Sequence, residues 1–151
     1  MALKLTLKPR ERFVINGAVV VNGERRSHLL IQNNVSILRE KDVMQEGDAS
    51  TPVRRIYFAI QMLYLDDSNS GAYLQLFERR LDEFLGAIKD REARAQCANI
   101  LADVQKGSYY RALSTCKKLF PFEEARLNYV PQEDEQDRES PPILQRAALA
   151  S

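Results

Sequence analysis

The sequence predicts an α+β protein with an N-terminal antiparallel β unit, a C-terminal antiparallel bundle of about four helices and a disordered acidic tail. Within residues 1–58, polar and apolar residues alternate over short runs that are separated by turn residues, as in half-buried strands. Beyond residue 70, apolar residues instead recur every three or four positions, as in amphipathic helices. The expected boundaries are 1–48 for the β unit, 52–128 for the bundle and 129–151 for the tail.

Alternation and turn residues indicate the strands of the β unit. Residues 4–8 alternate, so that Lys4 and Lys8 share one face of a strand and the leucines share the other. Asn16 and Gly17 accept the positive φ angles of a type I′ turn, which predicts a hairpin of residues 13–15 and 18–21. A second Asn-Gly pair at 22–23 predicts a further turn. The next strands are expected at 27–32 and 35–38.

Capping and breaking residues divide the helical half. They are Thr51 with Pro52 before the first helix, a polar break at 66–71 before the second, Asp90 before the third, and Gly107 with Ser108 before the fourth. Pro121 is expected to kink or end the fourth helix, because proline removes a backbone donor and clashes with the preceding turn, and residues 122–127 are able to resume it. Short loops between amphipathic helices predict antiparallel neighbours.

Charge is unevenly distributed along the chain. Residues 1–58 contain ten lysines and arginines against six aspartates and glutamates, a difference of +4, while residues 59–130 contain ten of each. Residues 131–151 contain two against five, a difference of −3. The stretch 132–140 is charged and has no apolar residue, which predicts disorder.

The sequence offers few groups for catalysis. His28 is the single histidine, and no paired cysteines are spaced to hold a metal ion. The six glycines form no phosphate loop and no dinucleotide fingerprint. We therefore expect a non-enzymatic protein without metal or cofactor. Cys97 and Cys116 fall at apolar helical positions and are predicted to be buried free thiols. No signal-peptide core and no membrane-spanning run is evident, so a cytoplasmic protein without membrane contact is expected.

The basic β unit suggests nucleic-acid binding. Phosphate contacts from lysine and arginine carry affinity, and strand edges can read the bases of single-stranded RNA. The residues expected to hold phosphates are Lys4, Lys8, Arg10, Arg12 and Arg39, and the same positive rim can also include Arg25, Arg26 and Lys41. The same surplus is also typical of an ordinary solvated face, because net charge speaks only to non-specific attraction.

The helical bundle offers a protein-binding alternative. Its apolar stripes are typical of a core, but a bundle that leaves part of a stripe open can receive a partner's amphipathic helix. Tyr109 and Tyr110 are consecutive and point about 100° apart on a helix, so both cannot face one core. One of these two tyrosines is therefore a candidate partner contact.

The chain resembles the FlbT family of bacterial flagellar regulators from about residue 3 to residue 127. The matching segments are LKLTLKP at 3–9, FVINGAVV at 13–20, VSILREKDV at 35–43, TPVRRIYF at 51–58 and YYRAL at 109–113. This resemblance implies a post-transcriptional repressor in flagellum biogenesis, which associates with the 5′ untranslated region of flagellin mRNA and promotes its degradation or blocks its translation. The alternative that it implies is a secretion chaperone that binds flagellin or FlaF through the bundle. The RNA sequence read, the oligomeric state, the primary activity and the role of the tail stay open.

Part of the β unit is also similar to the RNA-binding protein CsrA. The similar segments are RFVING at 12–17 and VSILREK at 35–41. In that family the first strand and the arginine of the last segment form the RNA-binding edge, which implies contacts from Leu3, Lys4 and Arg39. CsrA builds this edge from two interlocked chains, which implies a homodimer. Leu38 stands where CsrA has histidine, and the early paired arginines of CsrA are not reproduced in place.

Overall fold

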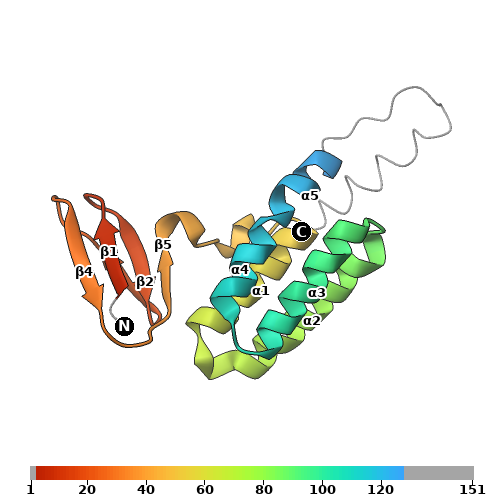
Figure 1. Cartoon of the computed structure of the whole chain (residues 1–151), viewed down its shortest axis with the longest axis horizontal. Coiled ribbons are helices and arrows are strands. Elements are labelled where there is room, and N and C mark those ends of the chain that lie inside the picture. Colours follow the sequence, from red (N-terminus) through yellow and green to blue (C-terminus); the bar gives the residue numbers. More distant parts are fainter. Residues whose placement is uncertain (1–2, 128–151) are drawn as a thin grey trace. The chain divides into compact units, whose positions relative to one another are not determined.

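The computed structural model describes residues 3–127, apart from the side chain of Asp67. It confirms the α+β class, with antiparallel strands first and helices after them (Figure 1). The chain forms two compact units. Within the described residues, the first unit contains residues 3–43 together with Tyr64–Ser68, and the second contains Met44–Leu63 and residues 69–127. The tail predicted at 129–151 lies outside the described residues.

Five short strands make two antiparallel sheets in the first unit. They are β1 (Leu3–Leu7), β2 (Arg12–Ile15), β3 (Ala18–Val21), β4 (Ser27–Ile31) and β5 (Ile37–Arg39). One sheet pairs β1 with β4, and the other has the order β3-β2-β5. The last strand therefore begins two residues later than predicted and includes Arg39.

The predicted hairpin is confirmed. Asn16 and Gly17 have φ angles of 48° and 83°, and they join β2 to β3. Asn16 also fixes the approach to β5, because its backbone N–H donates to the Ser36 carbonyl at 2.8 Å and its side chain accepts the Ser36 N–H at 3.0 Å. The turn thereby sets the register of β2 against both of its neighbours.

A small core holds the two sheets of the first unit together. Leu7 from β1, Phe13 and Val14 from β2, and Leu38 from β5 are buried. These residues come from both sheets. Among the described strands, none of one sheet pairs with a strand of the other, so the buried apolar side chains join the two sheets. Burial of such side chains stabilises each by roughly 1.5–3 kcal/mol.

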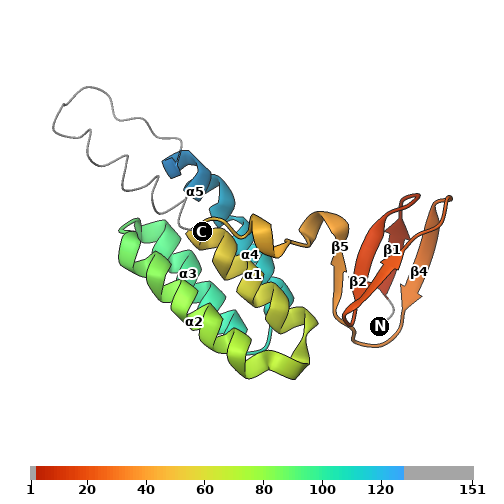
Figure 2. The ribbon, with the colours of Figure 1, turned by 180° about the vertical axis from the view of Figure 1, so that it is seen from behind.

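The second unit is helical (Figures 1 and 2). The helices are α1 (Pro52–Leu65), α2 (Ser70–Ala87), α3 (Arg91–Gln105), α4 (Tyr109–Lys117) and α5 (Leu119–Leu127), with short 3-10 turns at Glu40–Asp42, Glu46–Asp48 and Asp67–Asn69. The last two residues of α1 belong to the first unit. The apolar stripes of α1 to α4 pack inward, and Cys97 and Cys116 are buried free thiols as predicted.

The predicted caps are partly confirmed. Asp90 accepts the Ala93 N–H at 2.9 Å and caps α3, and Gly107 ends α3 with a φ of 78°. Ser108 occupies the capping position of α4, but its side chain makes no capping hydrogen bond. The fourth helix does not reach Pro121, where its end was predicted. It ends at Lys117, and Pro121 lies in the first turn of α5. The missing N–H of proline costs nothing there, because the first four N–H groups of a helix have no intrahelical partner.

Candidate nucleic-acid interface

Asn22 joins two turns at one end of the β unit. Its side-chain amide donates to the Lys8 carbonyl at 2.7 Å and to the Arg25 carbonyl at 3.0 Å, and its amide oxygen accepts the Ser27 hydroxyl at 2.6 Å. A backbone bond of 2.9 Å from Arg10 to the Gly23 carbonyl adds to these contacts. Residues 8–11, after β1, are thereby held beside residues 22–26, before β4 (Figure 1).

The two joined turns gather basic side chains. The exposed residues Lys8, Arg10, Arg25 and Arg26 of these turns, together with the exposed Arg12 at the start of β2, make up the group that we call the basic end. Of the two acidic residues within these turns, Glu24 is exposed and Glu11 is half-buried. A cluster of one sign of charge attracts phosphates, and it releases the counterions of a nucleic acid on binding.

The first of these turns is held in a fixed shape. Arg10 has a φ of 60°, a left-handed conformation that is uncommon for a residue other than glycine. The Glu11 N–H donates to the Lys8 carbonyl at 3.1 Å, and the Glu11 carboxylate accepts the Lys8 N–H at 2.9 Å. These bonds close the turn, and the Arg10 side chain on it is exposed.

Arg39 is placed differently from the basic end. Its half-buried guanidinium donates to the Thr6 carbonyl, and its Nε lies 3.7 Å from a carboxylate oxygen of Glu11. Within residues 3–127, this Nε has no hydrogen-bond partner. Arg39 therefore links β5 of one sheet to β1 of the other, and it neutralises the half-buried acid that closes the first turn.

Leu3 and Lys4 lie at the far end of β1. Both are exposed, and Lys4 pairs in register with the exposed Leu30. Four residues separate Lys4 from Lys8, which corresponds to about 13 Å along a strand. The structure therefore gathers three of the six predicted RNA contacts, Lys8, Arg10 and Arg12, and does not bring Leu3, Lys4 and Arg39 into the same cluster.

The predicted partner contacts lie in the helical unit. Tyr110 is 52% exposed and Tyr109 is half-buried, both in the first turn of α4. They face different directions, as the spacing of consecutive helical residues requires.

Sequence reasoning missed the role of Asn22. The Asn-Gly pair at 22–23 signals a turn, but nothing in the sequence shows that the asparagine side chain reaches back to the turn after β1. Arg25 and Arg26 thereby become neighbours of Arg10. An asparagine followed by glycine, just before two arginines, is the signal that was available.

The two cysteines do not have the character of nucleophiles. Burial raises the pKa of the Cys97 thiol to about 11, and burial together with the charges of Cys97 and Glu123 raises the pKa of Cys116 well above its ordinary value. Both thiols are therefore protonated near neutral pH, and the thiolate is the reactive form. Among the described residues, no group of histidine, cysteine or acidic side chains is arranged to hold a metal ion.

None of the helices in the described part of the chain is both long enough and apolar enough to cross a membrane.

The fold and the basic end together define a two-unit α+β protein whose small β unit presents a positive surface. This class of protein is typical of binding and regulation, since the site offers positive charge and hydrogen-bond donors.

Comparison with known proteins gives the family. The model of the family described as flagellar protein FlbT matches residues 3–127. The chain is 47% identical over 130 residues to a probable flagellum biosynthesis repressor protein FlbT of a Caulobacter species, covering 86% of this chain and 99% of the relative. It is 45% identical over 130 residues to the flagellum biosynthesis repressor protein FlbT of Caulobacter vibrioides, covering 86% and 92%. The chain belongs to the FlbT family. No solved structure matches it.

A more distant relative has the same description. A probable flagellum biosynthesis repressor protein FlbT of Rhodopseudomonas palustris is 36% identical over 129 residues, covering 85% of this chain and 99% of the relative. The relatives are named for repression and not for catalysis, and family membership therefore supports a repressor role in flagellum biosynthesis.

Proposed function

We propose that this protein represses flagellum biosynthesis by binding RNA at the basic end, and that the RNA is the 5′ untranslated region of flagellin mRNA. The observation that carries the proposal is the group of four exposed basic side chains on two turns that Asn22 ties together, with the exposed Arg12 next to them at the start of β2. The names of the FlbT relatives support the repressor part, and the resemblance of the β unit to CsrA supports the choice of RNA.

The basic end supplies affinity, and a strand edge supplies base recognition. Among the described strands, β1 pairs with β4 alone, so one side of β1 carries backbone groups that no neighbouring strand occupies. Bases of single-stranded RNA can hydrogen-bond to such groups while lysines and arginines hold the phosphates. The far end of this edge carries Leu3 and Lys4, which are the base-proximal contacts of the proposal.

Repression follows from occupancy. An RNA leader that is bound along β1 and the basic end is less accessible to the ribosome, which blocks translation. Degradation of the message requires a nuclease from elsewhere, because the chain supplies the binding step and no catalytic step in this proposal.

Fluorescence anisotropy of a labelled flagellin leader RNA tests the proposal, with a scrambled RNA of the same composition beside it. We expect tight binding of the leader and weaker binding of the scramble. The double variant Arg10→Gln/Arg25→Gln should lower the slope of log affinity against log salt by about 1.4, because each single-stranded phosphate contact contributes about 0.7. Equal affinity for the two RNAs, or an unchanged slope, would contradict the proposal.

A matched control separates the basic end from net charge. Arg79 and Arg91 are exposed on α2 and α3, outside the β unit. The double variant Arg79→Gln/Arg91→Gln removes the same charge, and we expect it to leave the leader affinity and its salt slope close to wild type.

A second candidate is a flagellin- or FlaF-binding chaperone that acts through the helices. The exposed apolar surface of Tyr110 and Leu74, at 52% and 39%, favours it. Co-purification with flagellin that is lost in Tyr110→Ala and kept in Arg10→Gln/Arg25→Gln would support this candidate. The reverse pattern would remove it.

A further inference from the structure

Exposed apolar side chains gather in the β unit. Among the described residues, seven large apolar or aromatic side chains are exposed, and five of them belong to this unit: Leu3, Val19, Val20, Val21 and Leu30. Three of the five are consecutive and make up most of β3, where Ala18 is exposed as well. Such a continuous run marks an interaction surface, whereas single exposed apolar residues are ordinary.

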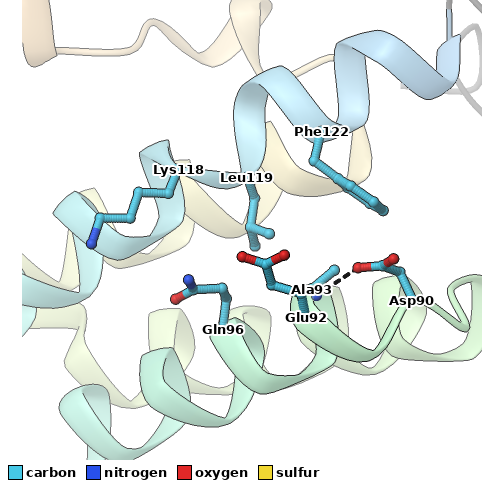
Figure 3. Close-up of a pocket in the computed structure, with 7 residues that line it drawn as sticks. All are labelled: Asp90, Glu92, Ala93, Gln96, Lys118, Leu119 and Phe122. Carbon is cyan, nitrogen blue, oxygen red and sulfur yellow. Dashed lines mark hydrogen bonds between the residues drawn. The ribbon is translucent and has the colours of Figure 1, made fainter.

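The hollow between α3 and α5 in the helical unit offers no comparable surface. Its volume of about 260 Å³ is below the range of small-molecule sites, roughly 300–1,000 Å³. Figure 3 shows its apolar side chains, Leu119 and Phe122 of α5, on the side opposite Ala93 of α3. Leu119 and Ala93 are buried, so they already belong to the core of the bundle. The Asp90 carboxylate is also in use, because it accepts the Ala93 N–H at 2.9 Å.

The position of β3 at the edge of its sheet adds backbone groups to the exposed valines. Among the described strands, β3 pairs with β2 alone. Natural edge strands are often protected by a charge, a proline or a bulge. Residues 18–21 contain no charged residue and no proline, and their register with residues 12–15 is continuous and has no bulge. The free edge of β3 is therefore open to another strand.

The hydrogen bonds to β2 show which backbone groups of β3 face the free edge. The Asn22 N–H, just after β3, donates to the Glu11 carbonyl at 2.8 Å. Successive pairs of an antiparallel ladder alternate between those that exchange hydrogen bonds and those that do not. Val20 and Ala18 therefore bond to β2 as Asn22 does, and the N–H and C=O groups of Val19 and Val21 point to the free edge.

We propose that β3 pairs antiparallel with β3 of a second copy of this chain, so that Val20 of one copy lies opposite Val20 of the other. In this register, Val19 of each copy lies opposite Val21 of the other copy. Both residues of such a pair have free backbone groups, so each pair exchanges two hydrogen bonds. The side chains of Val19 and Val21 from both copies then share one face and pack against one another. The two three-stranded sheets become one continuous sheet.

The charges near β3 favour a second copy as the partner. One end of β3 adjoins the basic end, and the other adjoins the uncharged turn of Asn16 and Gly17. Antiparallel pairing places the basic end of each copy beside this turn of the other copy, so the like charges stay apart. Pairing also occupies the free edge of β3 in both copies, and the assembly therefore closes at a dimer.

This dimer needs no exchange of strands between chains. β1 pairs with β4 and β2 pairs with β5 within one chain, and these pairs stay intact. It therefore differs from the interlocked arrangement that the CsrA resemblance implies. It also goes beyond the RNA proposal, because it uses the edge of β3 and leaves the free edge of β1 open.

Sedimentation equilibrium of the full chain without RNA tests the proposal. A pair of short strands buries less than a standard interface of about 1,600 Å², so we expect a reversible dimer that forms as the protein concentration rises through the micromolar range. Val19→Lys should raise the dissociation constant of the dimer about tenfold or more, because it brings two like charges close together on one face of the sheet.

Leu30→Lys is the matched control for Val19→Lys. Leu30 lies on β4 and is 67% exposed, close to the 70% of Val19, so the same charge is added to the same unit away from β3. We expect it to dimerise as wild type does. A single chain at every concentration, or an equal effect of both lysines, would overturn the proposal. Arg10→Gln/Arg25→Gln should also dimerise as wild type does, so failure of the RNA proposal is measured separately.

Cysteine cross-linking tests the register and covers the case in which Val19→Lys fails to fold. The Cα atoms of a pair that exchanges no hydrogen bonds lie about 4.5 Å apart, which a disulfide can span. Val20→Cys should therefore give a covalent dimer on mild oxidation, while the native Cys97 and Cys116 are buried. In Ala18→Cys the two cysteines would be four positions apart along the sheet, about 13 Å, and should not cross-link. No covalent dimer in Val20→Cys, or equal cross-linking in Ala18→Cys, would overturn the proposal.

Discussion

The carboxylate of Glu123 accepts the backbone N–H of Val53 at 2.9 Å, which joins the last described helix to the first turn of α1. Its other oxygen accepts the hydroxyl of Thr51, and the Thr51 hydroxyl also accepts the Arg54 N–H at 3.2 Å. Glu123 therefore caps a helix from a distant part of the chain. A negative charge is favourable at this end of a helix, where the backbone N–H groups have no intrahelical partner.

The pH dependence of stability should report on Glu123. Burial raises its pKa above the ordinary 4.5, and the hydrogen bonds from Thr51 and Val53 and the charges of Arg54 and Arg55 act in the opposite direction. The folded protein thus holds the proton more tightly than the unfolded chain. The contribution of Glu123 to the free energy of unfolding should fall as the pH rises from the pKa of the unfolded chain through the raised pKa of the folded protein, and then level off.

Urea unfolding at about pH 4 and about pH 7.5 measures this effect. Glu123→Gln cannot titrate, so wild type should lose stability relative to this variant between the two pH values. The exposed neighbour gives a control, Glu124→Gln, which should follow wild type. A constant difference between wild type and Glu123→Gln would contradict the expected direction.

Removal of the Glu123 side chain should destabilise the helical unit. Glu123→Ala leaves the Val53 N–H and the Thr51 hydroxyl without their acceptor in a buried place. We expect a loss of about 1–3 kcal/mol at neutral pH, measured by thermal or urea unfolding. Glu124→Ala serves as the matched control, and an equal loss there would show that the capping contact contributes nothing.

Asn22→Ala should weaken RNA binding without removing a charge. The change deletes the side-chain hydrogen bonds that hold residues 8–11 beside residues 22–26, so the basic side chains of the two turns are no longer held near one another. We expect a lower affinity for the leader RNA in the anisotropy titration, together with a lower unfolding temperature. Asn33→Ala, an exposed change in the segment after β4, should do neither. Wild-type affinity in Asn22→Ala would show that RNA binding does not depend on the hydrogen bonds of Asn22.

Arg39 is expected to act on the β unit more than on RNA. Arg39→Ala removes the link to the Thr6 carbonyl and leaves the half-buried Glu11 without its cation, so stability should fall by about 1–3 kcal/mol. The salt slope of RNA binding should stay near the wild-type value, because the guanidinium is engaged within the fold. A slope reduced by about 0.7 would instead make Arg39 a phosphate contact, as the CsrA resemblance implies.

Replacement of Gln61 by an apolar residue should also lower the stability of the protein. Its side chain accepts the Met44 N–H at 2.7 Å and donates to the Met44 carbonyl at 2.8 Å, both in a buried place. Gln61→Leu leaves two buried backbone groups without partners and should cost about 2–4 kcal/mol in urea unfolding, about 1–2 for each group. Gln75→Leu, an exposed change on α2, is the control. A cost near zero in Gln61→Leu would mean that the backbone of Met44 finds other partners.

Local patterns were sufficient for most of the fold. Asn16 with Gly17 specified a turn, Asp90 a helix start and Gly107 a helix end, because each acts on backbone within a few residues of itself. The effect of Pro121 was predicted only in part. A break at this proline and a resumed helix over residues 122–127 were expected, but α4 ends at Lys117, four residues before the proline, and Pro121 lies in the first turn of the new helix.

The contacts that build the site act over long separations. The placement of Arg39 against Thr6, and of Asn22 against Lys8, depends on how two sheets meet, which no periodicity records. The sequence shows where the basic residues are, but it does not show which arginines are exposed and which are bound within the fold. The structure separates those that are exposed on the two turns from the one whose guanidinium is half-buried.

The end of α1 belongs to the first unit, while the rest of this helix belongs to the second. The Tyr64 hydroxyl accepts the Ile37 N–H at 2.9 Å and donates to the Ile37 carbonyl at 3.2 Å, so a residue of α1 occupies the place of a strand neighbour beside β5. Opening of the β unit therefore removes these supports of the last helical turn. Amide hydrogen exchange of Tyr64 and Leu65 should then follow the rate of the strands, while the first three turns of the same helix exchange with the bundle.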